Sequence, residues 1–242
     1  MNDKLVSGSG SAKFGFAIWG LVCLVISLVG FWPSYVAPLT AGTYRSPSPM
    51  IPWHVLSTTL WLALIISQSW LIQLNRVDLH RRIGLFGILV AMSVVVTGIV
   101  VQIDVIGSYD AKGDTTNAVL IPFIRFSLLF GYAVCVAWAI VLRKRPDWHK
   151  RLILLGTFPL LQSSFDRMAA NVFGLLEIRG LMALAGHLVL MILFAFWDRR
   201  GQGYFHPVTK WGTILMILFY LVSPAIAGTE WWRELAANLA KR

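Results

Sequence analysis

The stretch from His54 to Gly84, HVLSTTLWLALIISQSWLIQLNRVDLHRRIG, decides which class of fold this chain adopts. It starts with an apolar run of about 20 residues, the length that an α-helix needs to cross a bilayer. Gln68 lies inside the run, and a basic cluster with His80 follows it. Positions alternating by four and three residues form one helix face: His54, Thr58, Trp61, Ile65, Gln68 and Ile72. Because polar side chains are costly in hydrocarbon, we expect this face to point into a helical bundle.

The composition agrees with an integral membrane protein. The chain has 242 residues, of which 57% are hydrophobic and only 13% charged, too few charges for the surface of a soluble domain of this size. The net charge is +10, and lysine and arginine gather between apolar runs, as the positive-inside rule expects. Since no nucleic-acid-binding motif accompanies the charge, the expected partner is the lipid bilayer and not nucleic acid.

The predicted fold is all-α: a polytopic membrane helical bundle, with residues 1–242 forming a single domain. The loops after the second, fourth and sixth spans are the basic ones, which predicts a cytoplasmic N-terminus. The tail EWWRELAANLAKR, residues 230–242, is expected to form an interfacial helix. The seven predicted transmembrane helices cover about residues 14–32, 53–74, 83–106, 118–142, 152–176, 180–197 and 211–227.

Histidines fall near both faces of the predicted membrane. His54 and His187 lie toward the outer face, and His80 and His149 lie at the inner face. A haem held by two imidazoles needs two histidines at one depth on different helices, so two haems need one pair at each side. This pattern predicts His54 with His187 and His80 with His149. The alternative is that each histidine is a hydrogen-bonded structural residue, a common role for a lone histidine in a membrane.

Charged residues gather in the outer half of the predicted bundle: Asp104 at the end of the third span, Arg125 in the fourth, and Asp166 and Arg167 in the fifth. An arginine in a membrane helix costs at least about 2.5–3.5 kcal/mol, so it needs a partner or water. We expect Arg125 to pair with Asp104 or Asp166. The cluster is either a site for a quinone, a haem propionate or a substrate, or a structural network that fixes the helices.

Two segments carry a family resemblance. LHRRIGLFG (residues 79–87) and HKRLILLGTFPLLQSSFDR (residues 149–167) resemble an uncharacterised family of bacterial multi-span membrane proteins with HR-x-x-G and H-x-R-x-(M/L) motifs. The likeness covers the second to fifth spans and implies a membrane bundle, located in a bacterial inner membrane, without implying an activity. The matching residues are His54, His80, Arg81, Gly84, His149, Arg151 and Arg167.

A looser likeness is to the two-haem transmembrane cytochromes b, which also hold a histidine pair near each membrane face. This chain departs from them because His80 and His149 are expected in charged loops at helix edges, whereas such ligands usually lie on helices. The cytochrome likeness implies haem b as the cofactor.

The leading hypothesis from the sequence is therefore a haem-b-binding protein of transmembrane electron transfer, acting as an oxidoreductase if it is an enzyme. Its redox partner would be a quinone or another acceptor. His54 and His187 would ligate the outer iron, and Arg125 or Arg167 would neutralise propionates. The alternatives are a transporter or small-molecule carrier, a structural or assembly protein, and a zinc site formed by His54, His187, Asp104 and Asp166.

Overall fold

A computed structural model describes residues 11–241, and every regular element in that range is helical. The predicted all-α class is confirmed, and six helices are long and apolar enough to span a membrane. The protein is thus a multi-pass membrane protein with lipid contacts. The predicted single domain also includes residues 1–10 and 242, which lie outside the described range. The long helices are α1 (Ser11–Phe31), α3 (Ile51–Gln73), α4 (Val77–Asp110), α5 (Thr115–Val141), α8 (Arg179–Gln202) and α9 (Pro207–Ala227).

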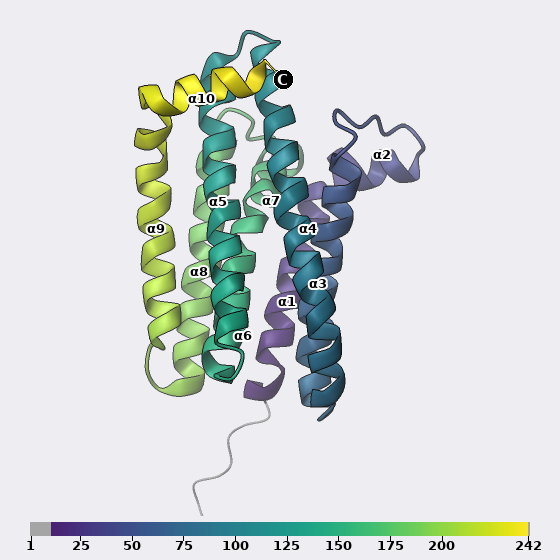
Figure 1. Cartoon of the computed structure of the whole chain (residues 1–242), viewed down its shortest axis with the longest axis vertical. Coiled ribbons are helices and arrows are strands. Elements are labelled where there is room, and N and C mark those ends of the chain that lie inside the picture. Colours follow the sequence, from purple (N-terminus) through teal and green to yellow (C-terminus); the bar gives the residue numbers. More distant parts are fainter. Residues whose placement is uncertain (1–10, 242) are drawn as a thin grey trace, which may run out of the picture.

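The segment predicted as the fifth span is a broken helix. It consists of α6 (Pro146–Thr157), a 3-10 turn η2 (Phe158–Leu161), α7 (Gln162–Arg167) and a π-helix η3 (Met168–Val172). Pro159 explains the first interruption, because proline has no backbone N–H to continue the helix. The segment connects the end of α5 to the start of α8. It lies lengthwise in the bundle, like the unbroken helices beside it (Figure 1). Residues 152–176 therefore do not form the single helix that we predicted.

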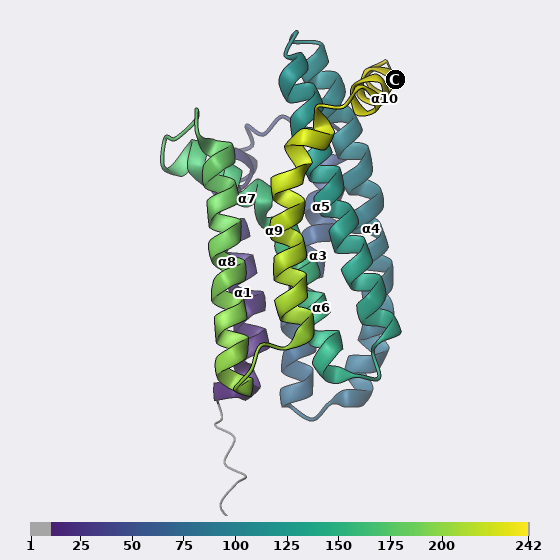
Figure 2. The same cartoon turned by 90° about the vertical axis from the view of Figure 1, so that its left-hand side faces the viewer.

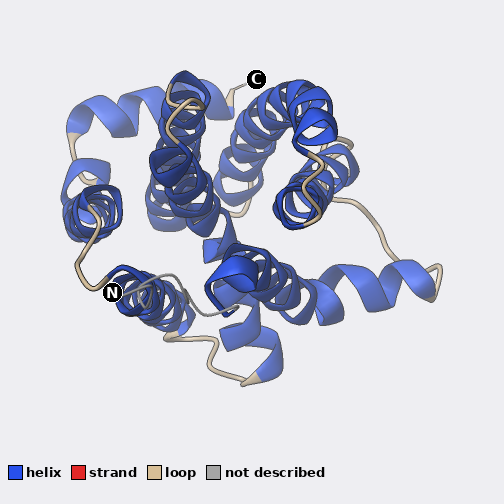
Figure 3. Cartoon of the chain, turned by 90° about the horizontal axis from the view of Figure 1, so that it is seen from below, coloured by secondary structure: helices blue, strands red, loops and turns tan. Residues whose placement is uncertain are grey.

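The helices run lengthwise up and down the bundle (Figures 1 and 2). α3 packs against α1 and α4, α4 against α5, and α5 against α6 and α9. Figure 3 views the bundle from the end at which α1 begins. We call this end the basic end, because arginines and lysines lie in or beside its connections 74–76, 142–145 and 203–206: Arg76, Arg81, Arg82, Arg143, Lys144, Arg145, Arg199, Arg200 and Lys210. The opposite end carries two further helices, α2 (Ala37–Thr40) after the π-helix η1 (Trp32–Val36), and α10 (Glu230–Ala240), and we call it the α10 end.

The outward faces of the helices are apolar, as a lipid-facing surface requires. Phe130 is 68% exposed, Leu89 63% and Leu221 64%, on three different helices. Soluble monomers rarely leave more than a few hundred Å² of contiguous apolar surface exposed. Exposed apolar side chains along α3, α4, α5, α8 and α9 are therefore explained by contact with hydrocarbon.

The face of α3 that we predicted to point inward does so for most of its length. Trp61 and Ile65 are buried, and His54 and Gln68 are half-buried, whereas Ile72 is 42% exposed at the end of the face. The indole N–H of Trp61 donates to the Thr157 hydroxyl oxygen at 3.1 Å. This bond ties α3 to the broken segment in the middle of the bundle.

The predicted tail helix is present as α10, which lies across the bundle (Figure 1). Trp232 is buried and its indole N–H donates to the Val119 carbonyl at 2.7 Å, while Trp231 is 64% exposed. Trp232 also packs edge-on against Phe123, with ring centroids 5.1 Å apart. One tryptophan therefore docks α10 onto α5, and the other points away.

Candidate functional site

The basic end brings together two histidines that the sequence analysis paired. His80 lies in the first turn of α4 and His149 in the first turn of α6, so both are on helices and not in loops as expected. The ring centroids are 6.4 Å apart, and the ring planes are inclined by 82°. Both helices begin about six residues earlier in the sequence than the predicted spans, α4 at Val77 and α6 at Pro146.

Each of these rings is held by a backbone carbonyl. His149 Nδ1 lies 2.8 Å from the Ala139 carbonyl oxygen, and His80 Nδ1 lies 3.3 Å from the Gln68 carbonyl oxygen. A carbonyl can only accept, so Nδ1 must carry the proton in both rings. Ala139 is within the last turn of α5, where carbonyls lack intrahelical partners. The two bonds thus fix a tautomer that leaves the Nε2 lone pair free in each histidine.

Arg151 anchors α6, the helix that carries His149, to α8 through an ion pair with Asp198. Its side chain is fully buried, and Nη2 lies 2.6 Å from Asp198 Oδ1, while Nε lies 2.9 Å from Oδ2. Asp198 also accepts from the Thr209 hydroxyl at 2.6 Å, so α6, α8 and α9 meet at one carboxylate. Two charge-assisted bonds from one guanidinium set both distance and orientation. The rotation of α6 about its axis, and with it the direction of His149, is therefore determined by this ion pair.

Space is present beside His80. A Cβ added at Gly84, one turn further along the same face of α4, would meet no heavy atom within 4 Å. At Gly87 it would meet only a Leu64 methyl carbon at 3.9 Å. Both amide atoms of the Gln68 side chain are buried without a hydrogen-bond partner in the described part of the chain. The open, half-buried position of Gly84, one turn from His80, leaves room for a flat group beside this part of α4.

The separation of the two rings allows both histidines to bind one iron. Metal–imidazole bonds are about 2.0–2.1 Å long. With ring centroids 6.4 Å apart, a nitrogen of each ring could reach the same metal. The donor set is also suitable, because neutral imidazoles whose other nitrogen is hydrogen-bonded are typical metal ligands.

The other predicted pair is arranged differently. His54 Nδ1 bonds to the Thr97 hydroxyl oxygen at 3.0 Å, and His187 Nδ1 bonds to the Tyr220 hydroxyl at 2.8 Å. His187 is fully buried, and its Nε2 has no partner among the described residues. Within residues 11–241 no contact between the His54 and His187 rings is found. These two histidines therefore have one partner each, and their joint ligation of an iron stays a prediction.

The charged cluster at the α10 end forms around Asp166. Its carboxylate lies 3.9 Å from Arg125 Nη2 and 3.7 Å from Arg179 Nε. Of the two partners expected for Arg125, Asp166 is therefore the one found, and Asp104 instead accepts a hydrogen bond from the Ser48 hydroxyl. Arg125 Nε is buried without a partner within the described residues. The cluster carries more positive than negative charge.

The fifth histidine of the chain has a different use. His206 is the N-cap of α9, and its Nδ1 accepts from the Val208 backbone N–H at 3.2 Å. Burial lowers the pKa of His206, and the Arg151 charge lowers it further, whereas Asp198 opposes the shift. The neutral ring is thus the folded form, and Nδ1 is an acceptor here where it is a donor in His80 and His149. His206 is a structural histidine and provides an internal control.

The sequence analysis missed several residues that build these sites. Asp198 was assigned to a basic loop, although it ends a buried face of α8 and pairs with Arg151. Tyr220 and Thr97, the partners of His187 and His54, were read only as parts of apolar spans. Thr97 lies one turn from Ser93 in a span of apolar residues, and that polar pair was the available signal. Tyr220 carried no comparable signal.

No three His, Cys, Asp or Glu side chains in residues 11–241 converge closely enough to hold a metal ion by themselves. The zinc set proposed from the sequence is therefore not assembled in the described structure. Comparisons with protein-family models, curated proteins and solved structures found no match to this chain. The family resemblance and the likeness to cytochromes b accordingly rest on the quoted sequence segments.

Proposed function

We propose that this protein is a haem-b-binding membrane protein of electron transfer, in which His80 and His149 would hold the iron of one haem. The observation that carries the proposal is the 6.4 Å separation of two rings whose Nδ1 atoms both donate to backbone carbonyls. The haem would supply one-electron redox chemistry near one membrane face. A quinone or another redox partner would then exchange electrons at this end.

The chain's own residues have distinct roles in this proposal. The carbonyls of Gln68 and Ala139 hold the imidazoles in one tautomer and increase the basicity of Nε2. The Arg151–Asp198 pair keeps His149 aimed at His80. Gly84 leaves room for a flat ring beside α4. A second haem between His54 and His187, with Arg125 or Arg167 near its propionates, is a further part of the sequence-based proposal.

The test is the absorption spectrum of the full-length protein purified in detergent after expression with ample haem. We expect a Soret band, and we expect His80→Ala and His149→Ala each to lose most of the haem that this site binds. His206→Asn is the matched control, because it replaces a histidine at the same end and preserves the helix cap. A wild-type protein without a Soret band contradicts the proposal, as does full haem binding by the His80→Ala and His149→Ala variants.

We also propose seven passes, with the broken segment α6–η3 as the fifth and the N-terminus in the cytoplasm of a bacterial inner membrane. The arginines and lysines in and beside the connections 74–76, 142–145 and 203–206 support this orientation, because all three connections lie at the end where α1 begins. Seven passes put the two termini on opposite sides. A reporter enzyme that folds only outside the cytoplasm should therefore be active when fused after Arg242 and inactive when fused before Met1.

A carrier is the second candidate function, favoured by the interruption of α6–η3. Transporters bind substrates where spanning helices are discontinuous, and Gln162 Oε1 and Ser164 Oγ are buried there without partners in the described structure. Proteoliposomes test it directly, with labelled phosphate and labelled succinate as probes. Uptake that Arg167→Ala abolishes would support a carrier, and absence of uptake of both probes would leave it without support.

A further inference from the structure

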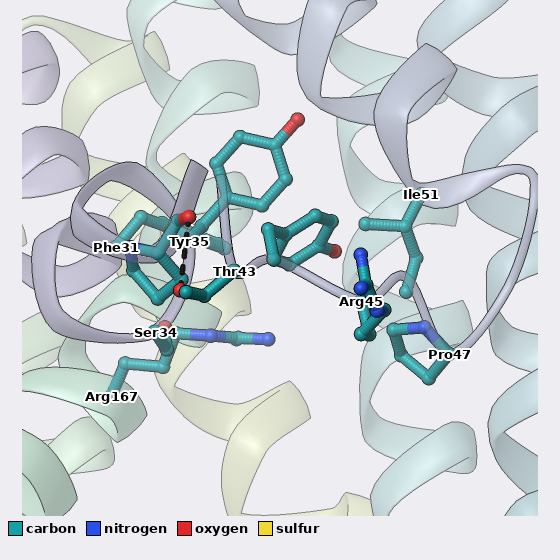
Figure 4. Close-up of a pocket in the computed structure, with 10 residues that line it drawn as sticks. Phe31, Ser34, Tyr35, Thr43, Arg45, Pro47, Ile51 and Arg167 are labelled. Atoms are coloured by element: carbon teal, nitrogen blue, oxygen red, sulfur yellow. Dashed lines mark hydrogen bonds between the residues drawn. The ribbon is translucent and has the colours of Figure 1, made fainter. Parts of the chain in front are cut away.

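A pocket of about 320 Å³ lies at the α10 end, away from the histidine pair. Its walls are the end of α1, η1, the connection 41–50 and the start of α3, with Arg167 of α7 closing one side (Figure 4). This volume is at the small end of the range of about 300–1,000 Å³ that is usual for ligand sites. The lining residues are Phe31, Ser34, Tyr35, Pro38, Thr43, Tyr44, Arg45, Pro47, Ile51 and Arg167.

Arg167 enters this pocket without a carboxylate partner among the described residues. Its guanidinium carbon lies 4.4 Å from the centre of the Phe31 ring, and Nη1 makes a long contact of 3.4 Å with the Ser163 carbonyl. The neighbouring Asp166 acts on Arg167 only through its charge, because its carboxylate lies in ion-pair distance of Arg125 and Arg179. A guanidinium has five N–H donors, so most of the hydrogen-bonding capacity of Arg167 is unused.

Arg45 faces the same pocket from the connection 41–50, and the two arginines reach in from opposite sides (Figure 4). No ion pair is found for Arg45 within residues 11–241. The lining contains no aspartate or glutamate, so its formal charge is positive on both sides. An anion in this pocket would therefore meet two guanidinium groups and no carboxylate from the lining.

The remaining lining residues define what kind of anion fits. The rings of Tyr35 and Tyr44 meet edge-on with centroids 4.7 Å apart, and Ser34 adds a hydroxyl to the wall. Thr43 is already engaged, because its hydroxyl donates to the Pro38 carbonyl at 3.3 Å. Arginine forks match the two oxygens of a carboxylate or a phosphate, and the tyrosine and phenylalanine rings provide an apolar wall.

We propose that this pocket binds the oxyanion of a small amphiphile, a phosphate or carboxylate group held between Arg167 and Arg45. Two sources share this chemistry: the phosphate of an anionic lipid headgroup and a free phosphate or carboxylate anion. Neither His80 nor His149 lines the pocket, so anion binding here can be tested separately from haem binding by that pair.

The experiment uses the full-length protein and separates the two sources. One arm measures binding of inorganic phosphate and of succinate by isothermal titration in uncharged detergent. The other arm detects retained phosphatidylglycerol by native mass spectrometry of protein extracted from nanodiscs that contain it. Variants are Arg167→Gln, Arg167→Lys, Arg45→Gln and, as a control of equal charge change at the same end but outside the pocket, Arg233→Gln.

We expect binding in at least one arm, weakened about tenfold or more by Arg167→Gln and several-fold by Arg45→Gln, and unchanged within twofold by Arg233→Gln. Arg167→Lys keeps the charge but loses the fork, so it should fall between wild type and Arg167→Gln. Arg45 is on an exposed connection, so its variant tests the proposal even if Arg167→Gln does not fold. Failure of wild type to bind any of the three probes, or equal losses in Arg233→Gln and Arg45→Gln, would overturn the proposal.

Discussion

At the basic end, the ring centroids of His80 and His149 are 6.4 Å apart. Toward the α10 end, His54 is hydrogen-bonded to Thr97 and His187 to Tyr220. The space around the histidines differs in the same way. A Cβ at Gly84 would enter open space near His80, while a Cβ at Gly98 would lie 3.1 Å from His54 and 2.9 Å from Leu129.

The difference lies in what surrounds each ring. The histidines at the basic end are oriented by backbone carbonyls and leave an open face, an arrangement suited to a ligand. The environment of His54 is already filled by protein. The α10 end has a different feature. Arg167 and Arg45, which form no ion pair with a described carboxylate, line the pocket there. The molecule therefore separates a histidine site from an arginine site along its length.

The largest effect expected is from breaking the ion pair that orients His149. Arg151→Ala leaves the Asp198 carboxylate buried without its partner, so we expect it to reduce stability by about 3–5 kcal/mol. Unfolding in mild detergent, followed by far-ultraviolet circular dichroism, measures the loss. Lys150→Ala is the control. Lys150 makes a partly exposed ion pair with Asp147 at 3.4 Å and lies 4.7 Å from the centre of the Phe16 ring, so the change should cost no more than about 2 kcal/mol.

The double change Arg151→Met with Asp198→Leu sharpens this prediction. It removes both charges at once and fills their space with apolar atoms, so much of the stability should return. His149 would nevertheless lose its orientation, and haem binding should stay low. Recovery of both stability and haem binding would show that the ion pair does not position His149.

A second prediction compares the two glycines of α4. Gly98→Ala should destabilise the protein by about 1–3 kcal/mol, because the added methyl group would overlap with Leu129 and crowd His54. Gly84→Ala meets open space and should leave stability unchanged or raise it by up to about 1 kcal/mol through helix propensity. The same unfolding assay checks both. Similar losses for both variants would refute the difference in packing between the two ends.

A larger residue at Gly84 tests the site itself. Gly84→Phe should reduce haem occupancy while leaving stability close to that of Gly84→Ala, because the ring would enter the space that we assign to the cofactor. Gly180→Phe is a suitable control, since a Cβ at Gly180 also meets nothing within 4 Å but lies at the start of α8. Undiminished haem occupancy in Gly84→Phe would place the cofactor elsewhere.

The smallest effect expected is the pH dependence of His206. Its pKa in the folded protein is lowered by burial and by the charge of Arg151, with Lys150 acting in the same direction and Asp198 and Asp147 opposing. As the pH falls, His206 in the unfolded chain is therefore protonated before His206 in the folded protein. The contribution of neutral His206 to folding stability is complete above pH about 6.5 and is lost as the pH falls from there through the pKa of the folded state. Protonation also removes the acceptor of the α9 cap, worth about 0.5–2 kcal/mol.

His206→Asn checks this assignment, because asparagine caps a helix without titrating near neutral pH. The difference in stability between pH 7.5 and pH 5.5 should be smaller in this variant than in wild type. An equal difference in both proteins would mean that other groups cause the acid sensitivity.

Hydropathy predicted most of the fold, and helical spacing predicted the inward face of α3 around Trp61 and Ile65. The break at Pro159 was missed because the apolar run continues through it. Beyond the break, helical spacing counted from α6 no longer predicts the direction of the Arg167 side chain. The Arg151–Asp198 pair was missed because the two residues are 47 positions apart and each lies next to a basic loop. Local patterns predict helices, whereas contacts between distant helices depend on how the helices are rotated.

The same reason explains the outcome for the candidate sites. Equal depth in the membrane suggested both histidine pairs, but depth does not say which way a side chain points. His80 and His149 meet because the carbonyls at the ends of neighbouring helices orient them. The pocket between Arg167 and Arg45 was not predicted, because the connection 41–50 has no periodicity from which its path could be derived.

The most direct test of the account is near-infrared magnetic circular dichroism of the double variant His54→Ala with His187→Ala, which keeps His80, His149 and the helix-capping His206. We predict bound haem with the signature of two axial imidazoles, and its loss when His149→Ala is added. A double variant that binds no haem, or haem whose spectrum is unchanged by His149→Ala, would contradict the assignment of His80 and His149 as ligands.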